Sequence, residues 1–228
     1  MQTDLVIAIC TLNRPKGLKL LLDELRSQVE KIPESIVKIA VVDNSVDRNA
    51  DWTISEHKEF SSLHYMHCSE RGLVNARNAA LDFAKSQNSP LAFIDDDEIP
   101  NEDWLKAALE NNQAYPEDIL AGPVIPLFSG HDAPEADFEF WNRPQFADNS
   151  ILKKPVGNGN ILFPRSLVQG SFRYSLKFNL SGGEDTELIL RFLDFGYNIR
   201  YLLNLKVNET VPIERQTLDY LLDRAFHS

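Results

Sequence analysis

Short, continuous apolar runs alternate along the chain with longer stretches in which apolar residues recur every three or four positions. Leu5 to Cys10 and Ile36 to Val42 are apolar runs of strand length, as in strands buried on both faces of a sheet. The stretch between them predicts an amphipathic helix. Its apolar face carries Leu18, Leu21, Leu22, Leu25 and Val29. This order predicts a βαβ unit with two parallel strands.

The same alternation continues to the end of the chain and predicts an α/β fold with a mostly parallel central sheet flanked by helices. Ile119 to Ile125 is expected to be a strand interrupted at Gly122-Pro123, and Phe128 to Ser150 a long loop. The helix from Leu188 to Leu193 is apolar almost all round and should be deeply buried. Other strands are expected at 63–67, 91–94, 161–163 and 199–203, and other helices at 54–60, 74–84, after Pro100 and at 217–226.

Composition narrows the class of protein. The 228 residues are 43% hydrophobic and 25% charged, which is enough for one large α/β domain or one and a half small ones. The net charge of −11 argues against a nucleic-acid binder, but it allows an anionic substrate whose charge a metal offsets. The two cysteines have no metal-binding spacing, and no signal peptide or membrane-spanning run is visible. These features predict a reduced, cytoplasmic protein.

Four consecutive carboxylates, Asp95 to Glu98, directly follow the apolar run from Leu91 to Ile94. Because unpaired charges are costly inside a sheet, the acidic run is expected at the carboxyl end of its strand, where open α/β sheets bind ligands. Clustered carboxylate oxygens suit a hard divalent cation such as Mg²⁺ or Mn²⁺. The alternative is a solvated acidic turn.

Polar residues also follow the first two strands. The turn from Thr11 to Arg14, together with Asp43, should line the same crevice as the acidic run. Asp43 could instead only shape its loop, and Arg14 could be a solvated turn residue. Arg77 lies in the first turns of a predicted helix, where the helix dipole disfavours a cation. Its partner is expected to be a phosphate, a crevice carboxylate or a carboxylate in a surface salt bridge.

Two further features are open to more than one interpretation. Glu184 and Asp185 begin the predicted helix that continues to Leu193, and the helix dipole alone would explain acidic residues there. Most aromatic rings between Phe128 and Ser150 are expected to pack against the body of the protein, whereas Trp141 could also stack on a sugar.

Taken in order, these pieces resemble the family 2 glycosyltransferases, which have the GT-A fold. The resemblance covers nearly the whole chain, from about Leu5 to about Phe226. It also rests on Gly72, Ala76-Arg77-Asn78, Gly159-Asn160 and the run from Gly183 to Leu188. It implies a single domain over residues 1–228 with a Rossmann-like sheet. A smaller acceptor-side portion would accompany this sheet. About 1–100 would form the nucleotide-sugar-binding half and about 101–228 the acceptor-binding half.

The resemblance also implies roles for residues on the donor side. Thr11, Asn13 and Arg14 would contact the sugar nucleotide, and Asp43 would recognise its base. Arg77 would reach the nucleotide or its phosphates.

The acidic residues match the family at other positions. Asp95 and Asp97 match its Asp-x-Asp pair, with Asp95 near the ribose or the metal and Asp97 on the Mn²⁺ or Mg²⁺ that bridges the diphosphate. Asp96, between them, would also contribute to donor binding. Asp185 matches the base that takes the proton of the acceptor hydroxyl, and Glu184 would hold the acceptor or the local hydrogen bonds.

One departure concerns the metal. Many relatives carry a histidine near the end of the domain, whereas the corresponding stretch from Val207 to Thr210 has none. Glu209 could replace that histidine as a ligand. The chain ends soon after its last predicted helix, which is compatible with a longer parent protein.

The implied function is that of a metal-dependent, inverting glycosyltransferase acting in cell-surface polysaccharide or glycan synthesis. Its donor would be a UDP-, GDP- or dTDP-sugar and its acceptor a glycan or a lipid-linked glycan, with peripheral contact to the inner face of the membrane. Two alternatives stay open. One is a non-catalytic nucleotide-sugar-binding domain of the same fold. The other is a nucleotidyltransferase, whose Gly-rich, basic loop is not evident between Thr11 and Gly17.

Overall fold

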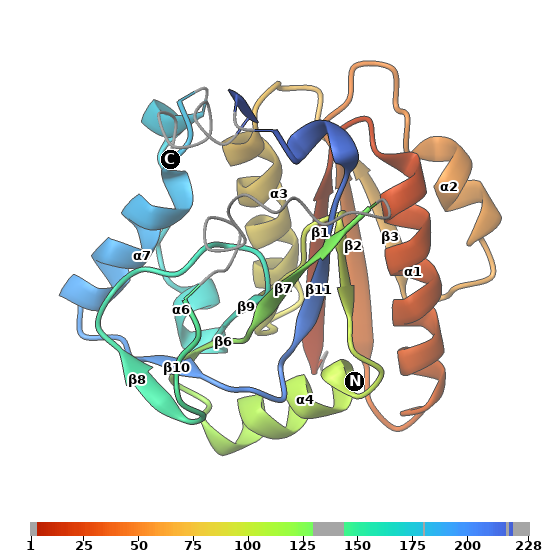
Figure 1. Ribbon diagram of the computed structural model, residues 1–228. Helices are drawn as coiled ribbons and strands as arrows, with labels where there is room; N and C mark the ends of the chain where they lie inside the picture. Colours follow the sequence, from red (N-terminus) through yellow and green to blue (C-terminus); the bar gives the residue numbers. More distant parts are fainter. Residues whose placement is uncertain (1–3, 130–143, 180, 218, 221–228) are drawn as a thin grey trace.

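A central β-sheet with helices on both faces forms the body of the protein in the computed structural model, which describes residues 4–129, 144–179, 181–217 and 219–220 (Figure 1). The strands are β1 (Leu5–Thr11), β2 (Val37–Asp43), β3 (Leu63–His67), β4 (Leu91–Phe93), β5 (Glu98–Pro100), β6 (Ile119–Ala121), β7 (Val124–Phe128), β8 (Ser150–Leu152), β9 (Ile161–Phe163), β10 (Ile199–Tyr201) and β11 (Val207–Val211). The α-helices are α1 (Pro15–Glu30), α2 (Asp51–Glu56), α3 (Leu73–Ser86), α4 (Trp104–Ala114), α6 (Arg165–Gln169) and α7 (Glu184–Asp194), and the 3₁₀ helices are η1 (Leu176–Phe178) and η2 (Ile213–Arg215).

The large sheet has eight strands in the order β3-β2-β1-β4-β9-β6-β10-β8. Strands β3, β2, β1 and β4 are parallel, so their carboxyl ends lie along one edge. Strand β9 is antiparallel to both of its neighbours, β10 is parallel to β6, and β8 is antiparallel to β10. The predicted βαβ unit of β1, α1 and β2 is confirmed, as is the mixed α/β fold with a mostly parallel sheet.

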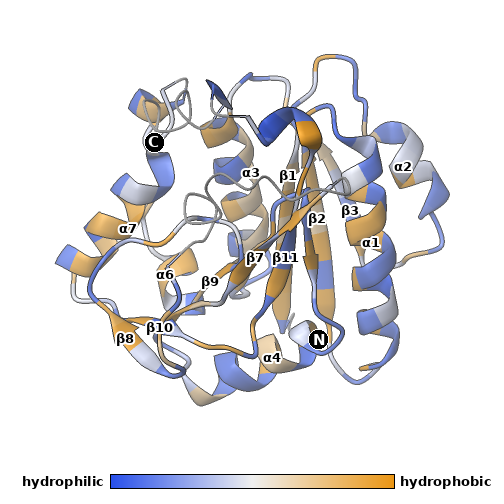
Figure 2. Cartoon of the chain, in the orientation of Figure 1, coloured by the Kyte–Doolittle hydropathy of each residue, from blue (hydrophilic) through white to orange (hydrophobic). Residues whose placement is uncertain are grey.

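Side-chain alternation along β1 explains why helices cover both faces of the sheet. Leu5, Ile7 and Ile9 pack with α1 and α4, whereas Val6 and Ala8 pack with α3, α6 and α7. All five side chains are fully buried, which accounts for the unbroken apolar run in the sequence. Figure 2 shows the same arrangement, with hydrophobic residues concentrated in the central strands and hydrophilic ones on the outer sides of the helices.

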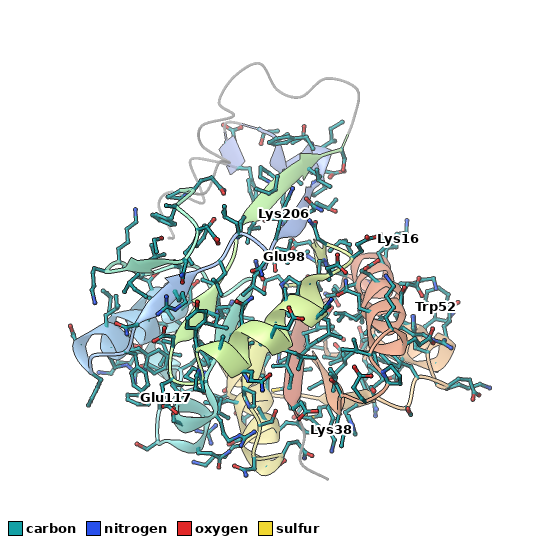
Figure 3. The ribbon with its side chains drawn as sticks, turned by 90° about the horizontal axis from the view of Figure 1, so that it is seen from below. Lys16, Lys38, Trp52, Glu98, Glu117 and Lys206 are labelled. Atoms are coloured by element: carbon teal, nitrogen blue, oxygen red, sulfur yellow. The ribbon has the colours of Figure 1, made fainter. Side chains whose placement is uncertain are left out.

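A second, three-stranded sheet in the order β5-β11-β7 lies beside the first. Its strand β5 begins at Glu98, the last residue of the acidic run, and Glu98 pairs with Glu209 in the antiparallel β5–β11 ladder. The Thr210 amide donates a hydrogen bond to the Asp97 carbonyl at 2.8 Å. The second sheet therefore brings the chain beyond residue 200 back to the acidic run. Glu98, at the start of β5, lies inside the protein, whereas Lys16 and Trp52 lie on its outside (Figure 3).

Some of the predicted elements differ from the observed ones. The strand expected at 119–125 is two strands in different sheets, because the chain leaves the large sheet at Gly122-Pro123. A Cβ atom at Gly122 would lie 1.9 Å from the Leu205 carbonyl oxygen, so no side chain fits at this crossing. The helix expected at 54–60 lies at Asp51–Glu56 instead, and β5, β8, β11 and α6 were not predicted.

Helix α7 is amphipathic rather than apolar all round. Leu188 and Ile189 are buried, but Leu190 is 46% exposed. Trp141 and most of the last predicted helix lie outside the described residues. Within the described ranges, no helix combines the length and the apolar character needed to cross a membrane.

Candidate active site

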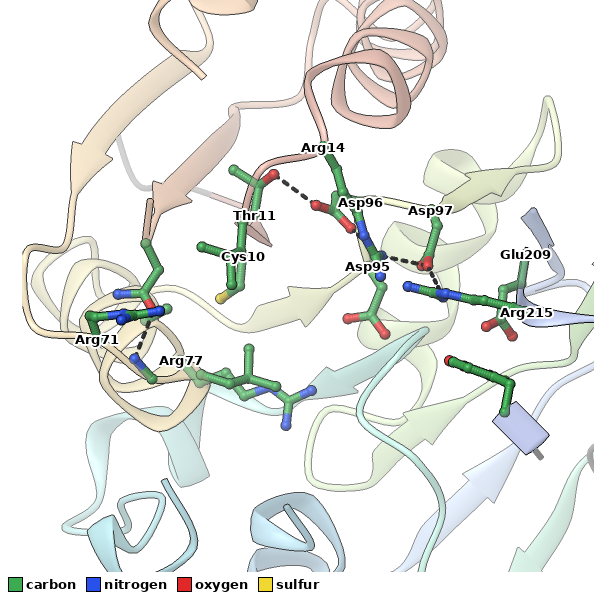
Figure 4. A pocket seen from close by; sticks show the side chains of 16 residues that line it. Cys10, Thr11, Arg14, Arg71, Arg77, Asp95, Asp96, Asp97, Glu209 and Arg215 are labelled. Carbon is green, nitrogen blue, oxygen red and sulfur yellow. Dashed lines mark hydrogen bonds and ion pairs between the residues drawn. The ribbon is translucent and has the colours of Figure 1, made fainter. Parts of the chain in front are cut away.

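The acidic run lies where the sequence placed it, beyond the carboxyl end of β4 and next to the end of β1. It lines a cavity of about 750 Å³, which also contains residues from the ends of β1 and β2, the start of α3, β11 and η2 (Figure 4). Four carboxylates and four guanidinium groups line this cavity: Asp95, Asp96, Asp97, Glu209, Arg14, Arg71, Arg77 and Arg215. In a protein with a net charge of −11, this cavity thus combines arginines that can bind an anionic ligand with carboxylates that can bind a cation.

Asp96 connects the acidic run to the turn after β1. Its side chain is buried, and it accepts hydrogen bonds from Thr11 Oγ1 at 2.7 Å and from Arg14 Nη1 at 2.9 Å. Burial raises the pKa of the Asp96 carboxyl, while Arg14 and Thr11 act in the opposite direction. These contacts tie the turn after β1 to the acidic run, so the structure brings Thr11, Arg14 and Asp96 together as expected.

Asp97 carries two cationic partners. Its Oδ2 atom lies 2.6 Å from Arg14 Nη1 and 3.1 Å from Arg215 Nη1. Burial raises the pKa of Asp97 to about 6, although the neighbouring Arg14 opposes this shift. The residue that resemblance assigns to a metal is therefore held by two guanidinium groups in this structure.

Asp95 lies against the loop of residues 157–160. A Cβ atom on Gly159 would lie 3.0 Å from Asp95 Oδ2 and 2.3 Å from Glu98 Oε1, so a glycine is needed for this close approach. The neighbouring Asn158 amide donates to Asp185 Oδ2 at 3.3 Å. Because consecutive Cα atoms are only about 3.8 Å apart, Asp95 and Asp185 lie against adjacent residues of one loop.

Buried hydrogen bonds of Asn160 hold the same loop in place. Trp104 Nε1 donates to Asn160 Oδ1 at 2.9 Å, and Asn160 Nδ2 donates to the carbonyl oxygens of Pro123 and Leu205. Asn160 has a positive φ of 56°, a backbone conformation that asparagine tolerates better than most residues. The Gly159-Asn160 motif therefore fixes the loop between the acidic run and α7.

Asp185 and Glu184, at the start of α7, have different surroundings. Asp185 is half-buried and accepts from the Thr186 amide at 2.7 Å, an arrangement that fits the helix-dipole explanation. Glu184 is buried and forms an ion pair with Arg77, which lines the cavity. Neither Asp185 nor Glu184 lines the cavity itself, so they adjoin it through Arg77 and the 157–160 loop. The surface-salt-bridge interpretation of Arg77 is wrong, because the pair is buried.

Asp43 and Asn13 are positioned away from the cavity. Asp43 is fully buried and accepts hydrogen bonds from the amides of Ser45 and Ala50 and from the Tyr65 hydroxyl. These bonds match the loop-shaping interpretation, and base recognition by Asp43 stays a prediction. Asn13 has a φ of 58°, accepts from Asn49 Nδ2 at 2.6 Å, and lines a neighbouring cavity of about 590 Å³.

Sequence reasoning assigned no role to several residues that line the cavity, among them Asn44, Arg71 and Arg215. Asn44 holds the loop before α3 through hydrogen bonds to the Cys68 and Glu70 carbonyls and from the Gly72 amide, and Arg71 lies beside it. The signal for Asn44 was its position directly after Asp43 at a strand end. Arg215 had no signal, because its place depends on the pairing of β11 with β5.

Carboxylates are the available ligands for a cation at this cavity. Asp95, Asp97 and Glu209 all line it, and such hard oxygen ligands suit Mn²⁺ or Mg²⁺. The described part of the chain contains no group of three His, Cys, Asp or Glu side chains that could hold a metal on its own. The residues therefore fit a divalent cation when phosphate oxygens of a substrate complete its coordination, as is common for Mg²⁺.

Solved structures show which fold this is. The crystal structure of S. aureus TarS matches with a TM-score of 0.70 and 17% identity, covering 92% of this chain and 37% of TarS. TarS residues 1–349 in complex with UDP match with a TM-score of 0.69 and 18% identity, covering 92% of this chain and 61% of that one. The shared fold is the GT-A type.

Curated relatives show the family. The succinoglycan biosynthesis protein ExoM of Rhizobium meliloti (strain 1021) is 31% identical over 231 residues, which cover 97% of this chain and 72% of ExoM. The glycosyltransferase AglE of Haloferax volcanii is 24% identical over 200 residues, which cover 86% of this chain and 63% of AglE. The family model described as glycosyl transferase family 2 matches residues 6–167. The chain therefore belongs to glycosyl transferase family 2.

Proposed function

We propose that this chain is an inverting glycosyltransferase that moves a sugar from a nucleotide-sugar donor to an acceptor hydroxyl. The observation that carries the proposal is the 157–160 loop, which lies against Asp95 on one side and bonds Asp185 on the other. A donor site at the acidic run and a base at the start of α7 would then lie on opposite sides of the transferred sugar.

The donor would occupy the 750 Å³ cavity. In this proposal Thr11, Arg14 and Asp96 form the floor at the end of β1, and Asp95 and Asp97 hold Mn²⁺ or Mg²⁺, with Glu209 as the further candidate ligand. The cation would stabilise the negative charge that develops on the diphosphate leaving group. Arg77 lies at the wall of the same cavity, where it would face the donor while it remains paired with Glu184.

The base in this proposal is Asp185. Its carboxylate takes the proton of the acceptor hydroxyl while the hydroxyl oxygen bonds to the anomeric carbon. The bond from that carbon to the diphosphate oxygen breaks, and the nucleoside diphosphate leaves with the electron pair. A single displacement of this kind inverts the anomeric centre. The Asn158 and Thr186 amides, which both bond Asp185, would fix the orientation of its carboxylate.

The names of one similar protein and of two similar structures support a nucleotide sugar as donor and a glycan as acceptor. ExoM is named for succinoglycan biosynthesis, and TarS structures contain UDP or UDP-GlcNAc. We propose a nucleoside-diphosphate sugar as the donor, with UDP, GDP and dTDP as the bases to be tested. The acceptor would be a glycan or a lipid-linked glycan in polysaccharide synthesis, reached by peripheral contact with a membrane.

A thermal-shift panel followed by a turnover assay tests the proposal. UDP, GDP and dTDP are each added with Mn²⁺, because a ligand that binds the native state raises the melting temperature. The matching nucleotide sugar is then assayed for Mn²⁺-dependent hydrolysis or transfer. A shift with turnover is expected. A shift without any turnover would favour a non-catalytic binding domain, and no shift with any diphosphate would contradict the proposed donor site.

A further inference from the structure

Arg215 lines the cavity but has no role in the function proposed above. It ends η2, beyond β11, and its guanidinium group reaches back to Asp97 across 118 residues of the chain. The backbone around it is fixed, since the Arg215 amide donates to the Pro212 carbonyl at 3.0 Å. The Gln216 side chain also donates to the Ser129 and Val211 carbonyls, at 2.9 Å each. These backbone and side-chain hydrogen bonds therefore place the Arg215 side chain next to the acidic run.

The two arginines at Asp97 are not equivalent. Arg14 bonds both Asp96 and Asp97, so it keeps one carboxylate partner if Asp97 is taken by another cation. Within the described residues, Arg215 has an ion pair with Asp97 and with no second carboxylate. A cation that binds Asp97 therefore competes with Arg215 for the carboxylate of its ion pair, while Arg14 keeps its bond to Asp96.

We propose that Arg215 is a diphosphate-binding residue, which pairs with Asp97 in the empty site and moves to the donor phosphates when a divalent cation takes its place at Asp97. The proposal rests on the proposed function, because it needs a nucleoside diphosphate in the cavity. Arg215 lines both this cavity and the neighbouring one, and its side chain is 24% exposed, so it has space to change partner. A guanidinium group suits the purpose, because its planar donors match phosphate oxygens.

This exchange links the binding of cation and diphosphate. The cation alone must displace Arg215 from its ion pair with Asp97, whereas the diphosphate alone must compete with Asp97 for Arg215. When both ligands bind together, the cation pairs with Asp97 and the diphosphate pairs with Arg215. Without the donor, Arg215 therefore lowers the affinity of Asp97 for a lone cation, and such a coupling acts equally on the affinities of both ligands.

The test measures binding rather than turnover. Free Mn²⁺ is followed by its electron paramagnetic resonance signal, with and without the diphosphate (UDP, GDP or dTDP) that gives the largest thermal shift. Diphosphate binding in Mn²⁺ is measured by calorimetry. The variants are Arg215→Ala and Arg215→Gln, with Arg215→Lys as the conservative change. Arg26→Ala is the matched control, because it removes one arginine from an exposed pair with Glu30 on α1.

Opposite changes in the two affinities are expected. Arg215→Ala and Arg215→Gln should weaken diphosphate binding in Mn²⁺ by about tenfold or more, since each loses a charge-assisted hydrogen bond. They should strengthen the binding of Mn²⁺ alone by several-fold, because the competing cation is gone, and Arg215→Lys should restore part of the diphosphate affinity. Arg26→Ala should change neither value.

The outcomes separate this inference from the proposed function. If the wild-type protein binds no diphosphate, the proposed donor site fails. If wild type binds one and Arg215→Ala or Arg215→Gln binds it equally well, the assignment of Arg215 is overturned. A parallel loss of both affinities would also overturn it, because that result indicates a purely structural role. Should Arg215→Ala not fold, Arg215→Gln decides the question, since it removes the charge but keeps a polar side chain with an N–H donor.

Discussion

Arg77 on α3 and Glu184 in the first turn of α7 form a buried ion pair that joins segments 107 residues apart. Only 6% and 7% of their side chains are exposed, and Arg77 also lies over the Tyr174 ring, 5.7 Å from its centroid. The pair links the wall of the donor cavity to the helix that begins with Asp185. It therefore connects the residues proposed to bind the donor with the residue proposed to activate the acceptor.

Breaking this pair should cost much of the stability of the protein. Arg77→Ala leaves the buried Glu184 carboxylate without its counter-charge, and we expect a loss of roughly 3–5 kcal/mol in the free energy of unfolding. Urea unfolding measures the loss. Arg26→Ala, which breaks an exposed pair on α1, should cost less than about 1 kcal/mol. Equal effects of the two substitutions would show that burial of the Arg77–Glu184 pair has no energetic consequence.

Asp185→Asn should separate donor binding from transfer. The amide keeps the size of the side chain but cannot take a proton, so we expect transfer to fall by roughly 10²–10⁴-fold. Affinity for the nucleoside diphosphate should stay unchanged, because Asp185 does not line the cavity. The control is Glu187→Gln, which removes a carboxylate on the same helix, where it pairs with Arg191. Transfer at the wild-type rate in Asp185→Asn would exclude this residue as the base.

The stability of the protein without metal should depend on the protonation of Asp97. Its folded-state pKa is raised to about 6, so the folded protein binds this proton more tightly than the unfolded chain does. The resulting contribution is present at low pH and is lost as pH rises from about 4 to about 6, by up to roughly 3 kcal/mol. The charged groups that act on Asp97 are Arg14, Arg215, Asp95, Asp96 and Glu209.

Unfolding at several pH values in EDTA measures this dependence. Asp97→Asn should remove its share of the slope between pH 4 and 6, whereas Asp194→Asn at the exposed end of α7 should leave the slope intact. Identical slopes in wild type and Asp97→Asn would show that Asp97 does not titrate in this range.

Asp43→Asn tests the loop-shaping interpretation. One acceptor oxygen becomes an amide group that faces donors from Ser45, Ala50 or Tyr65, so we expect a loss of about 1–3 kcal/mol. Asp47→Asn, in the same loop but exposed, should have little effect on urea unfolding. An unchanged unfolding free energy for Asp43→Asn would mean that these hydrogen bonds do not hold the loop, and base recognition would become the better account of the residue.

The sequence by itself determined the features that depend on local pattern. Continuous apolar runs located β1 and β2, helical spacing located α1, and four carboxylates after a buried strand placed the acidic run at the carboxyl edge of the sheet. These predictions succeeded because strand burial and helix amphipathicity are expressed within a few neighbouring residues.

Only the tertiary structure decided which charged groups meet. Arg77 reaches Glu184 because α3 and α7 cover the same face of the large sheet, and Arg215 reaches Asp97 because β11 pairs with β5. The separations along the chain are 107 and 118 residues. The change of sheet at Gly122 likewise depends on a carbonyl more than 80 positions away. Which ion pairs form depends on the distance between the groups in space and on the cost of leaving a buried charge unpaired. The local sequence of a strand or helix determines neither quantity.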